Sequence, residues 1–399
     1  MPQRRHLPLE DVRVIDCSRV LAGPYAAMVL GDMGADVIKV ERPGSGDDTR
    51  RWGPPFTGGE SAYYLSINRN KRSITLNLKS EEGREILKKL VAGADVLIEN
   101  FKHGDFDRMG IGYEDLRKVN PGLIYCAITG YGASGPYASK PGYDFMIQAE
   151  GGIMSITGPA DGEPYKVGVA IVDVTAGLYA ANAIQAALRY RDLTGQGQKV
   201  DVSLFESQIA WLINVASAYL VSGEKPKRYG NAHPSIVPYE TFPTADGYIA
   251  AGAGNDAQFR RFCHVLGLDD LPDDPRFATN PDRVTNRDVL IPMLQQRFRT
   301  KPTSEWMDLL EAAKIPCAPI NTIDKVFSHP QAKSRDMVVE VPHPTAGTVR
   351  LVGLPYKLSE TPLGIYRHPP LLGEHTEEVL NELGYSREEI SNLRNKGVI

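Results

Sequence analysis

The stretch VRVIDCSRVLAGPYAAMVLGDMGADVIKVERP, residues 12–43, sets the fold class. Residues 12–18 are rich in β-branched side chains and predict a strand. Residues 23–34 carry apolar side chains at helical spacing, with Pro24 in the first turn, and residues 36–43 return to a strand pattern. Strand, helix and strand joined by short connections form a βαβ unit, whose two strands are parallel.

The same alternation continues beyond this unit. Residues 79–94 predict a helix with Ser80 as its N-cap, a long alanine-rich helix follows Asp173, and an apolar helix continues to about residue 222. Further strands are predicted at residues 72–78, 95–101, 122–132 and 200–204. We therefore predict an α/β protein in which helices cover a parallel, Rossmann-like sheet.

The composition changes near residues 222–242, which are rich in glycine, proline and charge. This change predicts a domain boundary. Residues 1–222 then form the N-terminal part of a large domain, and residues 223–330 a linker and a smaller α+β domain. Residues 331–399 resume a strand pattern and end in two short polar helices.

The overall composition favours an enzyme in a reducing compartment. The chain has 399 residues and a net charge of −4, which gives no reason to expect nucleic acid or membrane as a partner. Its four cysteines are scattered and read as reduced thiols. No apolar run approaches the roughly 20 residues of a membrane span, and no apolar targeting segment follows the N-terminus. We expect a soluble cytoplasmic enzyme, or one of the mitochondrial matrix if the source is eukaryotic, although the sequence shows no clear transit peptide.

Asp173 is an ionisable residue at the entrance to an otherwise apolar segment, GVAIVDVTAGLYAANAIQAALRY, residues 168–190. One interpretation is a helix N-cap, because aspartate oxygens accept hydrogen bonds from unpaired backbone N–H groups. The other is a partly desolvated catalytic carboxylate at a helix N-terminus. The local sequence favours the N-cap.

The loops after the first strands carry several basic residues. The first turn, SRVLAGP, lacks the GxGxxG pattern, so NAD binding is disfavoured although Glu41 stands where a ribose-binding acid often lies. Each basic side chain alone is a solvated surface charge in most proteins, but several together favour an anionic cofactor such as a phosphorylated nucleotide. These residues are Arg19, Arg42, Arg50, Arg51, Lys71, Arg72 and Lys79.

Other motifs carry weaker signals. The loop AAGAGND, residues 250–256, is either a tight turn or a mobile lid that shields a reactive intermediate. The histidines show no HxxxH spacing, so no metal site is predicted, and no GxSxG motif marks a hydrolase serine. Asp144 and Glu150 are further candidate acids, although most such carboxylates are structural hydrogen-bond acceptors.

Several long, ordered motifs resemble the family III CoA-transferases, the family of formyl-CoA and carnitine CoA-transferases. They include NRNKRSITLNL at residues 68–78 and AITGYGASGPYASKPGYD at residues 127–144, and the resemblance extends from about residue 10 to the C-terminus. RPGSGDDTRRWGPPF, residues 42–56, and PPLLGEHT, residues 369–376, look most like the branch that uses succinyl-CoA and a dicarboxylate such as glutarate.

The resemblance implies roles for particular residues. Asp173 matches the nucleophilic carboxylate, which follows an apolar strand, and Tyr63 and Tyr143 match aromatic positions near the acyl group. Gly252, Ala253, Gly254 and Asn255 match a mobile glycine-rich loop. Lys140 matches a CoA contact with a one-residue difference in spacing. The other implied CoA contacts are Val20, Leu21, Ala22, Arg42, Leu76, Lys79, Asn100, Phe101, Arg108 and Met109.

The resemblance also implies the assembly and the ligands. It predicts an interlocked, ring-like homodimer whose large domain is completed by residues 331–399. Coenzyme A enters as an acyl-CoA substrate, the other substrate is a free carboxylic acid, and no cofactor is permanently bound. The expected reaction passes through an aspartyl anhydride and an aspartyl-CoA thioester.

Alternatives remain open on the sequence alone. Transfer from formyl-CoA to oxalate, or between another acyl-CoA and carboxylate pair, fits the same motifs. An α-methylacyl-CoA racemase is disfavoured because GYD, with Tyr143, replaces the family's GHD motif and removes the second proton carrier. A CoA-binding regulatory protein and a dinucleotide oxidoreductase are the other readings. His233 and Arg72 are candidates to bind a distal carboxylate.

Overall fold

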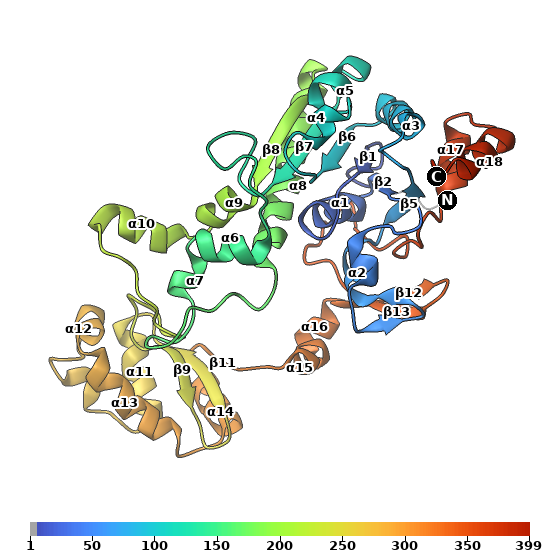
Figure 1. Ribbon diagram of the computed structural model, residues 1–399. Coiled ribbons are helices and arrows are strands. Elements are labelled where there is room, and N and C mark those ends of the chain that lie inside the picture. Colours follow the sequence, from blue (N-terminus) through green and yellow to red (C-terminus); the bar gives the residue numbers. More distant parts are fainter. Residues whose placement is uncertain (1–5) are drawn as a thin grey trace. The chain divides into compact units, whose positions relative to one another are not determined.

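A computed structural model describes residues 6–399, which divide into two compact units. The first unit comprises residues 6–153, Val167–Leu220 and Pro330–Ile399, so it contains segments from both ends of the chain (Figure 1). The second comprises Met154–Lys166 and Val221–His329. The short segment Met154–Lys166 was not assigned to this unit from the sequence.

The first unit is built on a six-stranded sheet in the order β5-β2-β1-β6-β7-β8, and every neighbouring pair is parallel. The predicted parallel α/β sheet is therefore confirmed. Counted along the chain, this is the 3-2-1-4-5-6 order of Rossmann folds, whose direction of winding changes between β1 and β6. The strands are β1 (Arg13–Asp16), β2 (Asp36–Glu41), β5 (Lys71–Thr75), β6 (Val96–Glu99), β7 (Ile124–Thr129) and β8 (Gln198–Ser203).

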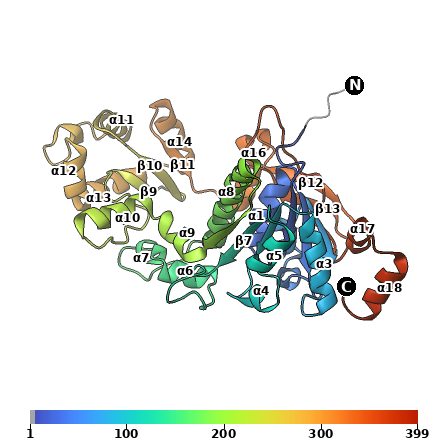
Figure 2. The ribbon, with the colours of Figure 1, turned by 90° about the horizontal axis from the view of Figure 1, so that it is seen from above.

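Helices cover both faces of this sheet. On one face, α1 (Ala22–Asp32) and α8 (Ile171–Thr194) share a hydrophobic core with the strands. On the other face, α3 (Glu81–Ala92) and α5 (Tyr113–Val119) form a second core with C-terminal residues (Figure 2). The Ser80 hydroxyl accepts a hydrogen bond from the Gly83 backbone N–H at 3.1 Å, which confirms the predicted cap of α3.

The C-terminal segment packs against the edge strand β5. Arg72 on β5 forms ion pairs with Glu378 and Glu382 at 2.9 and 2.5 Å. These two acids lie on α17 (Thr376–Glu382), which is followed by α18 (Arg387–Asn395). The same segment contributes the antiparallel hairpin of β12 (Val338–His343) and β13 (Gly347–Val352).

The start of α8 differs from the prediction. Residues 157–170 contain no strand, and α8 begins at Ile171 with Ala170 as N-cap and no capping side chain. Asp173 is therefore the third residue of the helix, so both the N-cap interpretation and the strand expected before Asp173 are wrong. The β-branched run was misleading because two of its members, Ile171 and Val172, belong to the first helical turn.

The apolar segments are also longer than the sequence suggested. By length and composition α8 could cross a membrane, as could the pair α9 (Leu204–Ala210) and α10 (Ile213–Ser222) if it were one span. Core helices of globular proteins pass the same test, and α8 contributes buried side chains to the core beside α1. The single apolar helix predicted up to residue 222 is wrong, because α9 and α10 are bent by 74°.

The second unit contains a three-stranded antiparallel sheet in the order β11-β10-β9. Its core centres on aromatic side chains, among which Phe242 and Phe298 stack at 4.6 Å between ring centroids. Its elements are β9 (Tyr239–Pro243), β10 (Tyr248–Gly252), α11 (Asp256–Leu266), η2 (Leu271–Asp273), α12 (Asn280–Thr285), α13 (Arg287–Phe298), α14 (Thr303–Ala312), β11 (Cys317–Pro319) and α15 (Ile323–Ser328).

Short elements complete the chain. They are η1 (Asp48–Arg51), β3 (Phe56–Thr57), β4 (Glu60–Ser61), α2 (Ala62–Ile67), α4 (Asp105–Arg108), α6 (Asp144–Glu150), α7 (Ile153–Ile156) and α16 (Pro330–Ser334).

Candidate active site

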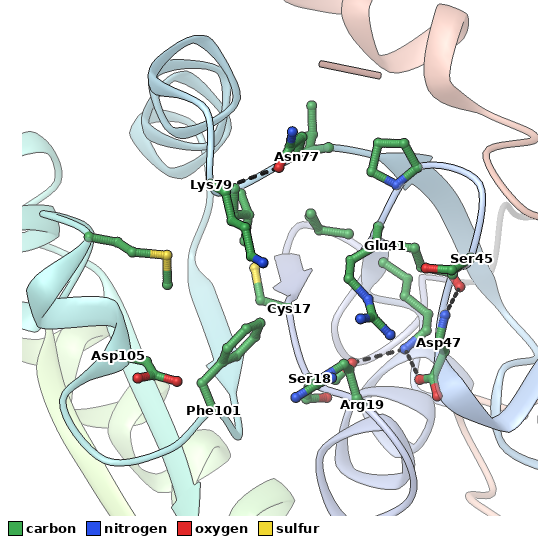
Figure 3. A pocket seen from close by; sticks show the side chains of 18 of the residues that line it. Cys17, Ser18, Arg19, Glu41, Ser45, Asp47, Asn77, Lys79, Phe101 and Asp105 are labelled. Carbon is green, nitrogen blue, oxygen red and sulfur yellow. Dashed lines mark hydrogen bonds and ion pairs between the residues drawn. The ribbon is translucent and has the colours of Figure 1, made fainter. Parts of the chain in front are cut away.

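A cavity of about 590 Å³ lies at the carboxyl ends of β1, β2, β5 and β6 in the first unit (Figure 3). Its lining combines apolar side chains with cationic ones, which suits a ligand with both a phosphorylated and an apolar part. Six of the predicted CoA contacts line it: Arg42, Leu76, Lys79, Phe101, Arg108 and Met109.

The cations of this cavity differ in how they are neutralised. Arg42 pairs with Asp48 at 2.8 Å, and Arg108 donates to Asp105. The Lys79 ammonium has no hydrogen-bond or ion-pair partner within residues 6–399. Lys79 is therefore the cation of this group that is ready to bind an anionic ligand.

A second cavity, of about 460 Å³, also lies within the first unit. Arg19 and Phe101 line both cavities, so the two share a wall at the point where the sheet changes its direction of winding. Eight further residues singled out from the sequence line the second one: Val20, Leu21, Ala22, Arg51, Asn100, Lys140, Tyr143 and Asp173.

The position of Asp173 is fixed by a contact from α6. The Asp144 carboxylate accepts hydrogen bonds from the backbone N–H groups of Val172 at 2.8 Å and Asp173 at 3.4 Å. Gln148 Nε2 donates to the same carboxylate at 2.7 Å. Asp144 therefore caps α8 from 27 residues upstream of its first residue, while the Asp173 side chain has no hydrogen-bond or ion-pair partner among residues 6–399.

The surroundings of Asp173 favour its protonated form. Burial raises the pKa of its carboxyl group, and the nearby charge of Asp144 raises it further, to about 7. The same carboxylate acts on Tyr63, because burial, followed by the charge of Asp173, raises the pKa of Tyr63 to about 12. The Tyr63 ring packs edge-on against Trp52, which lines the second cavity, with 5.2 Å between the ring centroids.

Several candidate residues have other partners. Arg50 binds Glu41 at 2.7 Å and Lys71 binds Asp16 at 2.9 Å, so these two cations stabilise the sheet. Neither Arg50 nor Lys71 lines either cavity. Arg72 likewise lines neither cavity. The Glu150 carboxylate pairs with Lys140 at 2.9 Å.

The glycine-rich loop lies in the second unit, between β10 and α11. The Ala253 N–H donates to the Pro238 carbonyl, and the Gly254 N–H donates to Gln258 Oε1, each at 2.8 Å. Asn255 caps α11 through the Gln258 N–H at 2.9 Å. The lid role of residues 252–255 stays a prediction, as does a substrate role for His233, which belongs to the same unit.

Sequence reasoning missed the residues that support the turn between the cavities. Asp47 and Lys39 are fully buried partners that line the first cavity. The signal for Asp47 was the preceding GSG, in which Gly44 and Gly46 have positive φ angles. An acid after such a turn at a strand end is well placed to bind backbone N–H groups.

The fold and the site together define a class of protein. A Rossmann-type sheet that places a cavity lined by cationic side chains beside a carboxylate of raised pKa is typical of an enzyme that acts on a nucleotide-bearing substrate. Residues 9–376 match the family model of CoA-transferase family III, and the chain belongs to this family.

Named relatives are similar over almost the whole chain. A human protein named succinyl-CoA:glutarate CoA-transferase is 48% identical over 98% of this chain and 90% of its own length. An Agrobacterium fabrum protein named succinate–glutarate CoA-transferase is also 48% identical, over 96% of this chain and 97% of its own. The family prediction is confirmed.

Solved structures agree with this assignment. A CAIB/BAIF family protein from Brucella suis is 46% identical, with a TM-score of 0.85, and covers 94% of this chain and 99% of its own. Rv3272 from Mycobacterium tuberculosis is 32% identical, with a TM-score of 0.84 over the same shares of the two chains.

Proposed function

We propose that this enzyme transfers CoA from succinyl-CoA to a dicarboxylate, with glutarate as the acceptor. The observation that carries the proposal is the unpartnered, half-buried Asp173 carboxylate in the second cavity, which adjoins the cationic first cavity. The identity of the substrates rests on the names of the relatives that are 48% identical.

In the proposed binding mode, the phosphorylated part of CoA lies in the first cavity near Arg42, Lys79 and Arg108. The pantetheine arm crosses the shared wall at Phe101 and brings the thioester to Asp173 in the second cavity. This mode uses the apolar and cationic parts of the lining for the matching parts of the ligand.

The proposed chemistry begins with ionised Asp173. A carboxylate oxygen attacks the succinyl thioester carbonyl, the C–S bond breaks, and a mixed anhydride and CoA thiolate form. The thiolate then attacks the aspartyl carbonyl, which releases succinate and leaves an aspartyl-CoA thioester. Glutarate attacks this thioester to form a second anhydride and thiolate, and the thiolate attacks the glutaryl carbonyl, which releases glutaryl-CoA and regenerates Asp173.

Water exclusion is essential to this sequence, because hydrolysis of either anhydride would consume the donor without transfer. The partial burial of Asp173 serves this requirement. Trp52, which lines the same cavity, and Tyr63, which packs against Trp52, are proposed to help keep water away. The loop at residues 252–255 is proposed to close over the site during the reaction.

The test compares Asp173→Ala with Asp192→Ala, which removes an exposed carboxylate from the same helix. We expect Asp173→Ala to lose transfer by about 10⁴-fold or more, because no other group can form the anhydride. Asp192→Ala should keep normal rates. Intact-mass measurement should detect covalently bound CoA only in proteins that retain Asp173, and normal transfer by Asp173→Ala would refute the mechanism.

Substrate identity needs a separate experiment. Succinyl-, acetyl-, formyl- and glutaryl-CoA are each combined with glutarate, oxalate and mesaconate, and the products are identified by mass. The fastest pair should be succinyl-CoA with glutarate. A faster reaction with oxalate, the acceptor named for an Acetobacter aceti relative that is 39% identical, would reassign the acceptor.

The enzyme is further proposed to act as an interlocked homodimer. The apolar helix α10 contains no buried residue, and Ile213 and Leu220 are 67% and 79% exposed. A second copy of the chain is the proposed cover for these side chains. The cytoplasmic location stays a prediction.

A further inference from the structure

The turn between β1 and α1, residues 17–21, forms one part of the wall between the two cavities, and Phe101 forms the other. Cys17 and Ser18 line the first cavity, Val20 and Leu21 line the second, and Arg19 lines both. A ligand that occupies both cavities must pass this shared wall and therefore lies beside the turn. The backbone geometry of the turn therefore sets how the two halves of the ligand are aligned.

Val20 has an unfavourable backbone conformation within this turn. Its φ angle is 69°, in the left-handed region. A β-branched side chain clashes with the backbone there, so the conformation persists only where neighbouring groups hold it. Such strain is common at functional sites.

Side chains from β1, from β2 and from the residue that directly follows β6 bind the polar backbone groups that precede Val20. The Ser18 N–H donates to Asp16 Oδ1 and the Lys39 ammonium donates to the Ser18 carbonyl, each at 3.0 Å. Asn100 accepts from the Arg19 N–H at 2.8 Å and donates to the Arg19 carbonyl at 2.7 Å. Both the carbonyl oxygen and the NH2 group of the Asn100 side chain therefore bind the turn, although the resemblance implied that Asn100 contacts CoA directly.

Asp47 completes this arrangement at the strained residue itself. The Val20 N–H donates to both carboxylate oxygens of Asp47, each at 3.3 Å. Asp47 pairs with the buried ammonium of Lys39 at 3.0 Å and accepts from the Thr49 N–H at 3.0 Å. Burial alone would raise the pKa of Asp47, but the Lys39 charge and these hydrogen bonds lower it to about 2, so the carboxylate stays ionised.

We propose that Asp47, supported by Lys39, is a positioning residue for CoA transfer: it holds Val20 in the left-handed conformation and thereby aligns the two cavities. The inference rests on the proposed function for the meaning of the cavities. Asp47 acts through the Val20 backbone and takes no part in bond making. Substitutions that weaken its hold should therefore lower kcat more than they raise KM for the acyl-CoA.

The test is a double-mutant cycle between Asp47→Asn and two substitutions of Val20. Val20→Gly and Val20→Ala both remove the two γ-methyl groups, but only glycine also lacks the Cβ and so adopts a φ of 69° without its penalty. We expect Asp47→Asn to lower kcat by about 100-fold in the native and Val20→Ala backgrounds. In the Val20→Gly background the loss should be smaller by about tenfold.

Thermal unfolding of the same variants gives a readout that does not depend on activity. Asp47→Asn should lower Tm less in the Val20→Gly background than in the Val20→Ala background. If Asp47→Asn alone does not fold, recovery of folded protein with glycine and not with alanine supports the proposal, and recovery with neither overturns it. If Asp47→Asn causes equal losses of kcat, or of Tm, in the Val20→Gly and Val20→Ala backgrounds, the proposal is also overturned. If the Tm coupling is present while the unmodified enzyme transfers no CoA, the proposed function fails and the positioning of Val20 stands.

Discussion

At the scale of single residues, the raised pKa of Asp173 predicts how the rate depends on pH. Only the ionised carboxylate attacks a thioester, and burial followed by the charge of Asp144 raises the pKa to about 7. The value of kcat/KM reports the free enzyme, so it should rise with pH up to about 7 and fall about tenfold per unit below that. Initial rates over a pH series check this, and a rate that stays constant from about pH 5 to 8 would contradict it.

Asp144→Asn tests the cause of that shift. An asparagine keeps an oxygen that can cap α8 but removes the second negative charge near Asp173. The acidic limb of the kcat/KM profile should therefore move to lower pH, while burial keeps it above the ordinary value of 3.8. Asp192→Asn, on the exposed part of the same helix, is the control that should leave the limb in place.

The same carboxylate should reduce stability at neutral and alkaline pH. The folded-state pKa of Asp173 lies above its unfolded value, so the folded state binds more protons between pH 3.8 and about 7, and stability falls as pH rises through this window. Asp173→Asn should then increase the free energy of unfolding by about 1–2 kcal/mol at alkaline pH. Denaturant melts at acidic and alkaline pH check this, and a gain that is equal at both would refute the electrostatic cause.

At the scale of elements, the close approach of α1 and α8 brings Ala22 beside the start of the catalytic helix. A Cβ added at Gly177 on α8 would lie 2.6 Å from the Ala22 carbonyl oxygen, which is backbone and cannot rotate away. Gly177→Ala should therefore separate the two helices and lower kcat by about 10–100-fold, with a smaller effect on Tm.

Gly93→Ala is the matched control for Gly177→Ala, since its added Cβ meets no atom within 4 Å and its φ is −110°. Steady-state kinetics and thermal melts of both variants decide the matter. Equal kcat values for the two variants would show that the close packing of α1 on α8 is not needed for catalysis.

The elements of the parallel sheet were predictable because their signals are local. β-branched runs, short connections and the Ser80 cap all act within a few residues of where they stand. The start of α8 was not predictable in this way, because its capping group comes from Asp144 on α6. The bend between α9 and α10 also escaped prediction, since Ile213 adopts a φ of 40° within an apolar run that carries no glycine or proline.

The residues of the candidate site were likewise predictable from local sequence in part only, since some of their roles depend on contacts between separate segments. The resemblance named Asp173 and some of the residues that line the cavities, because these stand in long motifs, but Tyr63 and residues 252–255 line neither cavity. The roles of Asp47 and Lys39 depend on ion pairs and hydrogen bonds between segments 8 to 27 residues apart, such as Lys39 with Asp47 and Val20 with Asp47, and these appear only in the folded chain.

At the scale of the whole molecule, the exposed face of α10 predicts self-association. Leu220→Asp places a charge at an apolar position that is 79% exposed, so it should spare the fold of the single chain and weaken a dimer that buries this face. Sedimentation velocity should give a dimer for the native protein and a larger monomer fraction for the variant. Glu224→Ala, a change at an exposed position just after α10, is the control, and a native monomer at all concentrations would refute the homodimer.

The return of the chain to β5 has a consequence for synthesis. Val379, Leu380 and Ile390 complete the core beneath α3, and Arg72 finds its acidic partners more than 300 residues later. The three-stranded unit between residues 221 and 329 emerges from the ribosome before these residues do. The second unit can thus fold during translation, whereas the nascent sheet must wait with one face incomplete. Chaperone demand should accordingly concentrate on the N-terminal half of the nascent chain.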